Sequence, residues 1–270
     1  GGLDRRRRVP PGPAGVLSLE TPVSRPHYQL LDTLRGLCVA SMVCYHGMYD
    51  LVHLYGVSAG WYQGLPGHLW QQSICWTFIL LSGMCWQLSR HHVKRGLLLV
   101  GCGAAITLVT WLVMPSQRIL YGVLTLLGLS ALLLVPLDKG LRNVPPWAGL
   151  LGALLLFFLT RNLPQGSLGF EGLVLCQLPG WLYQTDLLAV AGLPSPTFWS
   201  TDYFPLLPWF FMYLFGVWLG RAAAAEKLPA WFYRLRCPFL EKVGSHTLWI
   251  YLLHQPLCLG LTLLLVRLLG

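Results

Sequence analysis

The stretch that decides the fold is LLDTLRGLCVASMVCYHGMYDLVHLYG, residues 30–56. Its length and its apolar residues are typical of a membrane-spanning helix. It nevertheless contains five ionisable residues: Asp32, Arg35, His46, Asp50 and His53. Ionisable side chains in such helices are rare, and they usually face the interior of a helix bundle or a water-filled cavity. The stretch therefore predicts a spanning helix with a functional polar face.

The five ionisable residues are predicted to share one stripe, because a helix turns about 100° per residue and all five fall within about 60°. Arg35 and His46 are separated by about 16 Å along the axis, which places them toward opposite membrane faces. His46 and Asp50 are four residues apart and can touch, as a general base and its orienting carboxylate do. The alternative is a polar cluster that only joins helices, with Asp32 capping the helix and pairing with Arg35.

The composition indicates an all-α integral membrane protein. Of 270 residues, 55% are hydrophobic and 11% are charged, whereas soluble domains carry roughly 25% charged residues. Apolar runs predict a bundle of about seven transmembrane helices, near residues 30–50, 69–89, 96–114, 119–137, 145–160, 205–220 and 246–267. Residues 168–193 are apolar but contain Pro179 and Gly180. We interpret them as a re-entrant or interfacial segment; if they cross fully, there are eight spans.

The basic residues indicate the orientation. The net charge is +9, but most Lys and Arg residues fall in alternate connections between the spans, so no nucleic-acid partner is expected. The positive-inside rule then predicts a cytosolic N-terminus and an exoplasmic C-terminus. Residues 1–27 are rich in Pro, Gly and Arg and are interpreted as a disordered basic cytosolic tail preceding one polytopic domain, residues 28–270. The eight cysteines lack a C-x-x-C pair, so neither a metal site nor a disulfide framework is expected.

Other polar residues at membrane depth are further candidates. Asp202 and Tyr203 begin the sixth span in STDYFPLLPWFF, where Asp202 fits a helix cap as well as a catalytic carboxylate. His254 and Gln255 precede a helix-kinking proline in TLWIYLLHQPLCLG and are expected either to pack in the core or to line a cavity. Arg118 begins the fourth span and fits either interfacial snorkelling or binding of an anionic sugar group.

Five blocks of the sequence, in this order, carry a family resemblance: LLDTLRGLCVASMVCYHGMYDL, FILLSGMCWQLS, ILYGVLTLLG, DYFPLLPW and GSHTLWIYLLHQP. The chain resembles bacterial members of the heparan-alpha-glucosaminide N-acetyltransferase catalytic-domain family over most of residues 28–267. The Arg35-to-His46 spacing also resembles a motif of the wider integral-membrane acyltransferase superfamily. The resemblance implies transfer of an acyl group, expected to be acetyl, from cytosolic acyl-CoA to an exoplasmic glycan or amino sugar.

The resemblance implies roles for His46 and Arg35, and the positions of the other polar residues suggest theirs. His46 would be the base or the acyl relay, with Asp50 and Asp202 as catalytic carboxylates. Arg35, with Asp32, would position the CoA end, and the basic turn SRHHVKRG, residues 89–96, could attract a CoA phosphate. Arg118, Tyr203, His254 and Gln255 would contact the acceptor. In the larger eukaryotic enzyme the catalytic histidine follows the first span, which leaves His53 and His68 as alternatives.

The resemblance to bacterial proteins implies a plasma-membrane location, and a homo-oligomer is compatible with it. Two other functions remain open. A proton-coupled transporter also needs intramembrane Asp, His and Arg residues, and broken segments such as 168–193 line the substrate paths of transporters. A structural membrane subunit would tolerate replacement of His46 and Asp50.

Overall fold

The computed structural model describes residues 28–269, so the predicted tail lies outside the described residues. In this part of the chain, seven helices of 15 to 23 residues form the bundle: α1 (Gln29–Tyr49), α3 (Leu65–Met84), α4 (His92–Val113), α5 (Val123–Leu141), α6 (Pro146–Thr160), α7 (Leu206–Ala224) and α10 (Thr247–Leu269). Shorter helices connect them: α2 (Gly60–Gln63), α8 (Ala230–Arg234) and α9 (Pro238–Ser245). Each of the seven predicted segments coincides with one of the long helices.

Five of the long helices, α4, α5, α6, α7 and α10, are long and apolar enough to cross a membrane. They support an integral membrane protein. The other two, α1 and α3, are of similar length but more polar, because α1 contains the ionisable stripe and α3 begins with LPGHLWQQS. The predicted number of seven spans therefore stays a prediction.

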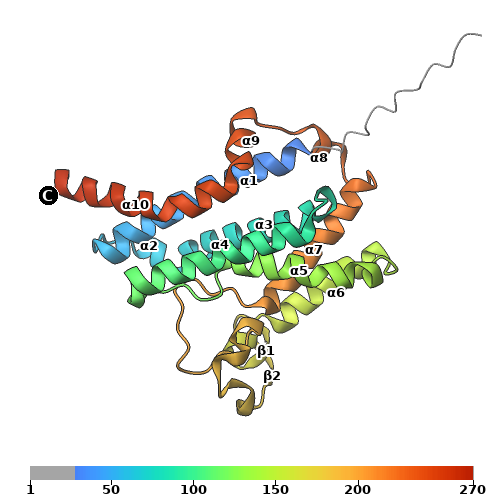
Figure 1. The fold of residues 1–270 in the computed structure, drawn as a ribbon, viewed down its shortest axis with the longest axis horizontal. Helices are drawn as coiled ribbons and strands as arrows, with labels where there is room; N and C mark the ends of the chain where they lie inside the picture. Colours follow the sequence, from blue (N-terminus) through green and yellow to red (C-terminus); the bar gives the residue numbers. More distant parts are fainter. Residues whose placement is uncertain (1–27, 270) are drawn as a thin grey trace, which may run out of the picture.

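The long helices alternate in direction along the chain (Figure 1). The start of α1, the connections α3–α4 and α5–α6, the end of α7 and α8 all lie at one end of the bundle, which we call the basic end; we call the opposite end the far end. The first and last long helices are parallel neighbours: Gly36 approaches Gly244 just before α10, and His46 approaches His254 further along. The segments 30–56 and 246–267 are thus adjacent in space.

Close helix contacts depend on glycines. A Cβ atom at Gly36 would overlap the backbone of Leu240 in α9, and one at Gly244 would overlap the backbone of Asp32. Small residues allow backbones to approach in this way in membrane helices, where packing replaces the hydrophobic driving force. The main apolar cluster lies between α3, α5, α6 and α7 and includes Phe157 and Leu134, both fully buried.

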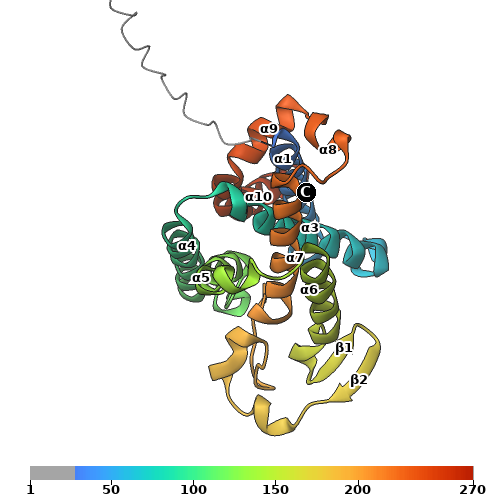
Figure 2. The same cartoon turned by 90° about the vertical axis from the view of Figure 1, so that its right-hand side faces the viewer.

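The segment 168–193 does not form a spanning helix. It contains a two-stranded antiparallel hairpin, β1 (Ser167–Phe170) and β2 (Leu173–Gln177), followed by two 3-10 helices, η5 (Gly180–Tyr183) and η6 (Asp186–Ala191). The hairpin is a local addition to the mostly helical fold that was predicted, and its paired strands satisfy the backbone groups that a broken helix would leave open. The hairpin lies outside the cluster of helices, beside the ends of α6 and α7 (Figure 2).

Candidate active site

At the basic end, Arg35 is held between two helices. Its Nη1 atom donates to Asp32 Oδ1 at 2.5 Å, and its Nη2 atom contacts the Cys85 thiol in η2 (Cys85–Leu88). Arg95 of α4 lines the adjoining cavity together with Trp86, the residue that follows Cys85. The buried thiol thus has the Arg35 guanidinium as its direct contact. The pairing of Asp32 with Arg35 is confirmed, while a role in binding CoA stays a prediction.

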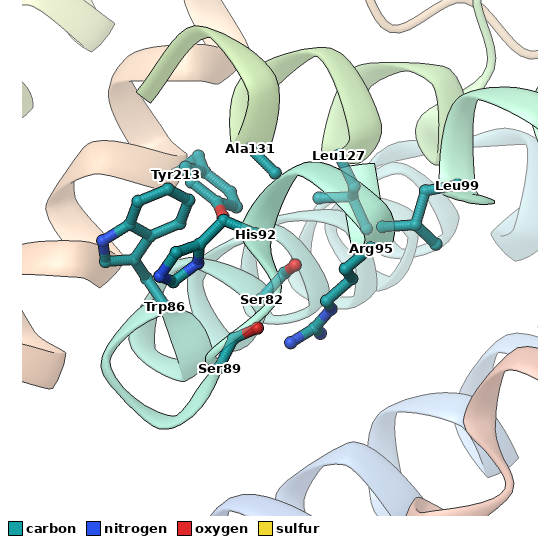
Figure 3. A pocket seen from close by; sticks show the side chains of 9 residues that line it. All are labelled: Ser82, Trp86, Ser89, His92, Arg95, Leu99, Leu127, Ala131 and Tyr213. Carbon is teal, nitrogen blue, oxygen red and sulfur yellow. The ribbon is translucent and has the colours of Figure 1, made fainter. Parts of the chain in front are cut away.

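A small cavity lies next to this site (Figure 3). It has a volume of about 10 Å³, the size of one water molecule, between the end of α3, η2, α4, α5 and α7. Arg95, Ser82 and Ser89 lie on one side of it, while the rings of Trp86 and His92 stack at 3.7 Å on the other. An open groove of about 620 Å³ at the start of α4 is lined by seven residues: Arg90, His91, His92, Val93, Lys94, Leu97 and Val135.

Near the far end, His46 of α1 faces His254 of α10. Their ring centroids are 4.7 Å apart with the planes tilted by 59°. His254 is buried, and its Nδ1 atom lies 2.6 Å from the Tyr251 carbonyl oxygen. If Nδ1–H donates to that carbonyl, Nε2 carries a lone pair, and Nε2 has no hydrogen-bond partner in the described chain. His46 is partly exposed. The two histidines thus form a pair that the sequence did not predict.

Asp50 does not orient His46 as predicted. Its Oδ1 atom accepts a hydrogen bond from Gln255 Nε2 at 3.1 Å, and its Oδ2 atom is buried without a partner. The Gln255 Oε1 atom is also buried without a partner. The Asp50 N–H donates to the His46 carbonyl, so the α-helical spacing holds between these two residues, and the π-helical turn η1 (Asp50–Leu54) begins only at Asp50. Asp50 therefore pairs with α10.

The other two candidate histidines lie elsewhere. His53 is exposed and stacks on Tyr49 at 4.4 Å, and His68 is exposed in the first turn of α3. His53 lies in the π-helical turn after α1, so the α-helical spacing that placed it on the stripe does not apply to it. Of the three histidines, only His46 lies in the contact between α1 and α10, which we call the α1–α10 seam and define by His46, Asp50, His254 and Gln255.

Asp202 caps a helix, but not the one that it precedes. Its carboxylate accepts a hydrogen bond from the Val123 backbone N–H, the first residue of α5, and lies against Gly122. Desolvation raises the pKa of Asp202 to about 6, although this hydrogen bond partly lowers it. A catalytic role for Asp202 stays a prediction.

The structure places Tyr203 and Arg118 in local contacts. The Tyr203 hydroxyl donates to the Ala189 carbonyl at 2.5 Å and so fixes η6 to the loop before α7. Burial raises the pKa of Tyr203. Arg118 Nε donates to the Trp199 carbonyl at 3.3 Å, in a loop pair where the Thr201 N–H also donates to the Arg118 carbonyl. Both contacts join neighbouring loops, as structural residues do. Binding of an acceptor by Tyr203 or Arg118 stays a prediction.

Sequence reasoning missed Arg161. It ends α6, its side chain is 14% exposed, and it contacts Gln72 of α3 and the ring of Trp209 in α7. Arg161 also forms an ion pair with Glu171, which lies in the turn of the hairpin. An arginine at the end of an apolar helix is normally predicted to lie at the membrane interface. The burial of Arg161 is visible only from the packing of the three helices around it.

The residues of the described chain supply two chemical settings. Guanidinium groups at the basic end can attract anions, and the imidazole pair in the α1–α10 seam can move a proton. Within residues 28–269, no group of three or more His, Cys, Asp or Glu residues could hold a metal ion. The eight cysteines are free thiols.

Residues 27–256 match the family described as heparan-alpha-glucosaminide N-acetyltransferase, catalytic. The chain belongs to this family. Membership indicates a membrane acetyltransferase type of activity, and acetyl-CoA is the donor that the family uses in general. The comparisons with curated proteins and with solved structures gave no match.

Proposed function

We propose that this family member transfers an acetyl group from cytosolic acetyl-CoA to an amine or hydroxyl of an exoplasmic carbohydrate. The basic end would face the cytosol, in keeping with the positive-inside rule, and the far end would face the exoplasm. The observation that carries the proposal is the pair of His46 and His254 in the α1–α10 seam. His46 lies on the same helix as Arg35, about 16 Å from it along the axis.

The donor side is supported by charge. Acetyl-CoA carries several phosphates, and guanidinium groups bind phosphate with charge-assisted hydrogen bonds. Arg35 contacts Cys85, Arg95 lines the adjoining cavity, and the groove at the start of α4 adds Arg90 and Lys94. These residues would hold the nucleotide part of the donor at the basic end while its thioester extends toward His46.

The chemistry is assigned to His46, with His254 as its partner. His46 would take the proton from the acceptor nitrogen or oxygen as that atom attacks the thioester carbonyl, and the CoA thiolate would leave. Alternatively, His46 would attack first and carry the acetyl group before passing it to the acceptor. The Tyr251 carbonyl fixes the ring of His254, which then accepts a proton from His46 or orients it. His254 thus takes the role that the sequence suggested for Asp50.

The unpaired oxygen atoms in the seam indicate that the molecule accepting the acetyl group carries a hydrogen-bond donor. Asp50 Oδ2 and Gln255 Oε1 are hydrogen-bond acceptors without partners. Buried polar atoms are normally paired, so an acceptor amine or hydroxyl that donates to them would gain from their isolation. We assign these two residues to binding the acceptor.

The test is an acetyl-transfer assay with purified protein, acetyl-CoA and a panel of amino sugars and neutral sugars. His46→Ala should lower transfer by about 10²-fold or more, the usual contribution of a general base. His53→Ala is the matched variant, because His53 lies on the same helix continuation but outside the seam. Undiminished transfer by His46→Ala, or loss of transfer only in His53→Ala, would contradict the assignment.

The two chemical routes can be separated with radiolabelled acetyl-CoA. If His46 carries the acetyl group, label should remain on the wild-type protein in the absence of acceptor and should be missing from His46→Ala. If transfer is direct, neither protein should retain label while the wild type still acetylates the acceptor. Uptake of a solute into proteoliposomes without CoA dependence would instead favour a transporter.

A further inference from the structure

The open groove at the start of α4 lies beside the contact between α4 and α5. The two helices approach each other closely, because a Cβ atom at Gly128 would lie 2.7 Å from the Gly96 carbonyl oxygen. Helices that approach through glycines leave their longer side chains beside the contact, and here such side chains line the groove. Its volume of about 620 Å³ is within the range of binding sites for small molecules.

Part of the groove is cationic. Arg90 and Lys94 line it, both are exposed, and neither forms an ion pair with another residue of the described chain. The sequence contains no Asp or Glu between Asp50 and Asp138. Both carboxylate oxygens of Asp138 are already bonded to other arginines. The two cations of the groove therefore lack an anionic partner among residues 28–269, and a phosphate group complements them.

The rest of the groove is an apolar wall, which consists of Val93, Leu97 and Val135. These side chains are 49%, 58% and 40% exposed. Because α4 lies at the edge of the bundle beside α5 (Figure 2), its outer side faces lipid in a membrane. Leu108 and Leu112 continue the exposed apolar surface along α4. A soluble nucleotide would leave the apolar wall uncovered, whereas the acyl chains of a phospholipid would cover it.

We propose that this groove binds an anionic phospholipid from the membrane leaflet at the basic end. Arg90 and Lys94 hold its phosphate, and the upper part of its acyl chains lies along the apolar wall. Basic pockets beside membrane helices bind lipid headgroups through the same charge attraction. The lipid site does not depend on acetyl transfer. Since the proposed function also assigns Arg90 and Lys94 to the donor, the two proposals together make the lipid a competitor of acetyl-CoA.

The test titrates the purified full chain in detergent with phosphatidylglycerol or phosphatidylcholine of the same acyl chains, and native mass spectrometry measures the bound lipid. Phosphatidylglycerol should bind about tenfold or more tightly, because phosphatidylcholine balances its phosphate with a choline cation and each Lys or Arg contributes roughly fivefold. The double variant Arg90→Gln with Lys94→Gln should remove this preference. Both side chains are exposed, so the variant should fold normally.

The matched control is Lys139→Gln with Lys227→Gln, which removes two exposed charges from the same end of the bundle but outside the groove. Equal losses of phosphatidylglycerol binding in the two double variants would overturn the proposal, as would equal affinities of the wild type for the two lipids. Glycerol phosphate has the phosphate without acyl chains, and its displacement of the lipid at equal concentration would assign the groove to a soluble phosphate instead.

Acetyl-CoA separates this proposal from the proposed function. At a saturating concentration it should lower the amount of bound phosphatidylglycerol, because the two ligands share Arg90 and Lys94. Phosphatidylglycerol that stays bound would support the lipid site and contradict the assignment of these two residues to the donor.

Discussion

Two buried aspartates, Asp138 in α5 and Asp50 in the α1–α10 seam, have opposite surroundings. Both carboxylate oxygens of Asp138 are bonded: Oδ2 to Arg142 at 2.6 Å and Oδ1 to Arg221 at 2.8 Å. Arg221 also lies 4.3 Å from the Trp218 ring. Asp50 is fully buried, accepts one hydrogen bond from Gln255, and forms no salt bridge with a cation of the described residues.

The difference separates a structural site from a candidate binding site. A paired carboxylate at the basic end joins the ends of α5 and α7, and its loss leaves a buried cation. An unpaired carboxylate in the seam contributes little to the fold, because its desolvation is not offset by partners. Buried polar atoms that remain unsatisfied require another explanation, and a bound substrate supplies one. Substitutions at the two positions should therefore affect different properties.

The largest effect on stability is expected at Asp138. Asp138→Ala should lower the free energy of unfolding by about 3 kcal/mol, because it leaves Arg221 buried without its carboxylate. Detergent unfolding followed by tryptophan fluorescence measures this change. Arg142→Ala is the matched control and should cost less than about 1 kcal/mol, because the Arg142 side chain is 73% exposed. Equal losses of unfolding free energy in Asp138→Ala and Arg142→Ala would show that the pair of Asp138 with Arg221 does not provide the stabilisation.

Asp50→Asn should show the reverse pattern. The free energy of unfolding should stay unchanged or rise by about 1 kcal/mol, because the neutral amide costs less to bury and can still accept from Gln255. Acetyl transfer should fall by about 10-fold or more, since an amide binds the acceptor group less strongly than a carboxylate. Parallel transfer and unfolding assays measure the two effects. A large loss of stability with normal transfer per folded molecule would place Asp50 with Asp138 as a structural residue.

The smallest effect is expected from Asp202, through pH. Its folded pKa, about 6, lies above the ordinary value of 3.8, so the protonated form is favoured by folding. The stabilisation from this group is present below about pH 4 and is lost as the pH rises through about 6. Asp202→Asn keeps an acceptor for the Val123 N–H and should remove this part of the pH dependence. Melting curves between pH 4 and pH 7 that coincide in shape for both proteins would contradict this prediction.

Sequence reasoning succeeded where the pattern is local. Length and hydropathy locate each long helix within a few residues, since the bilayer demands apolar segments of about 20 residues. It failed at Asp50, whose carboxylate is bonded to Gln255 of α10 and not to His46, because local spacing cannot show a partner from a distant helix. It also did not predict the strand pairing within residues 168–193, which were expected to form a re-entrant or interfacial segment.

The amino-acid sequence by itself determined the seven helical segments, the ionisable stripe on the first of them and the family, because periodicity, hydropathy and ordered motifs are properties of the linear chain. Only the tertiary structure decided which polar groups meet. It placed His46 against His254, across 208 residues of sequence, and Arg161 against Gln72, across 89. Such pairs depend on how helices pack, and the close approach of backbones at glycines such as Gly36 and Gly244 sets that packing.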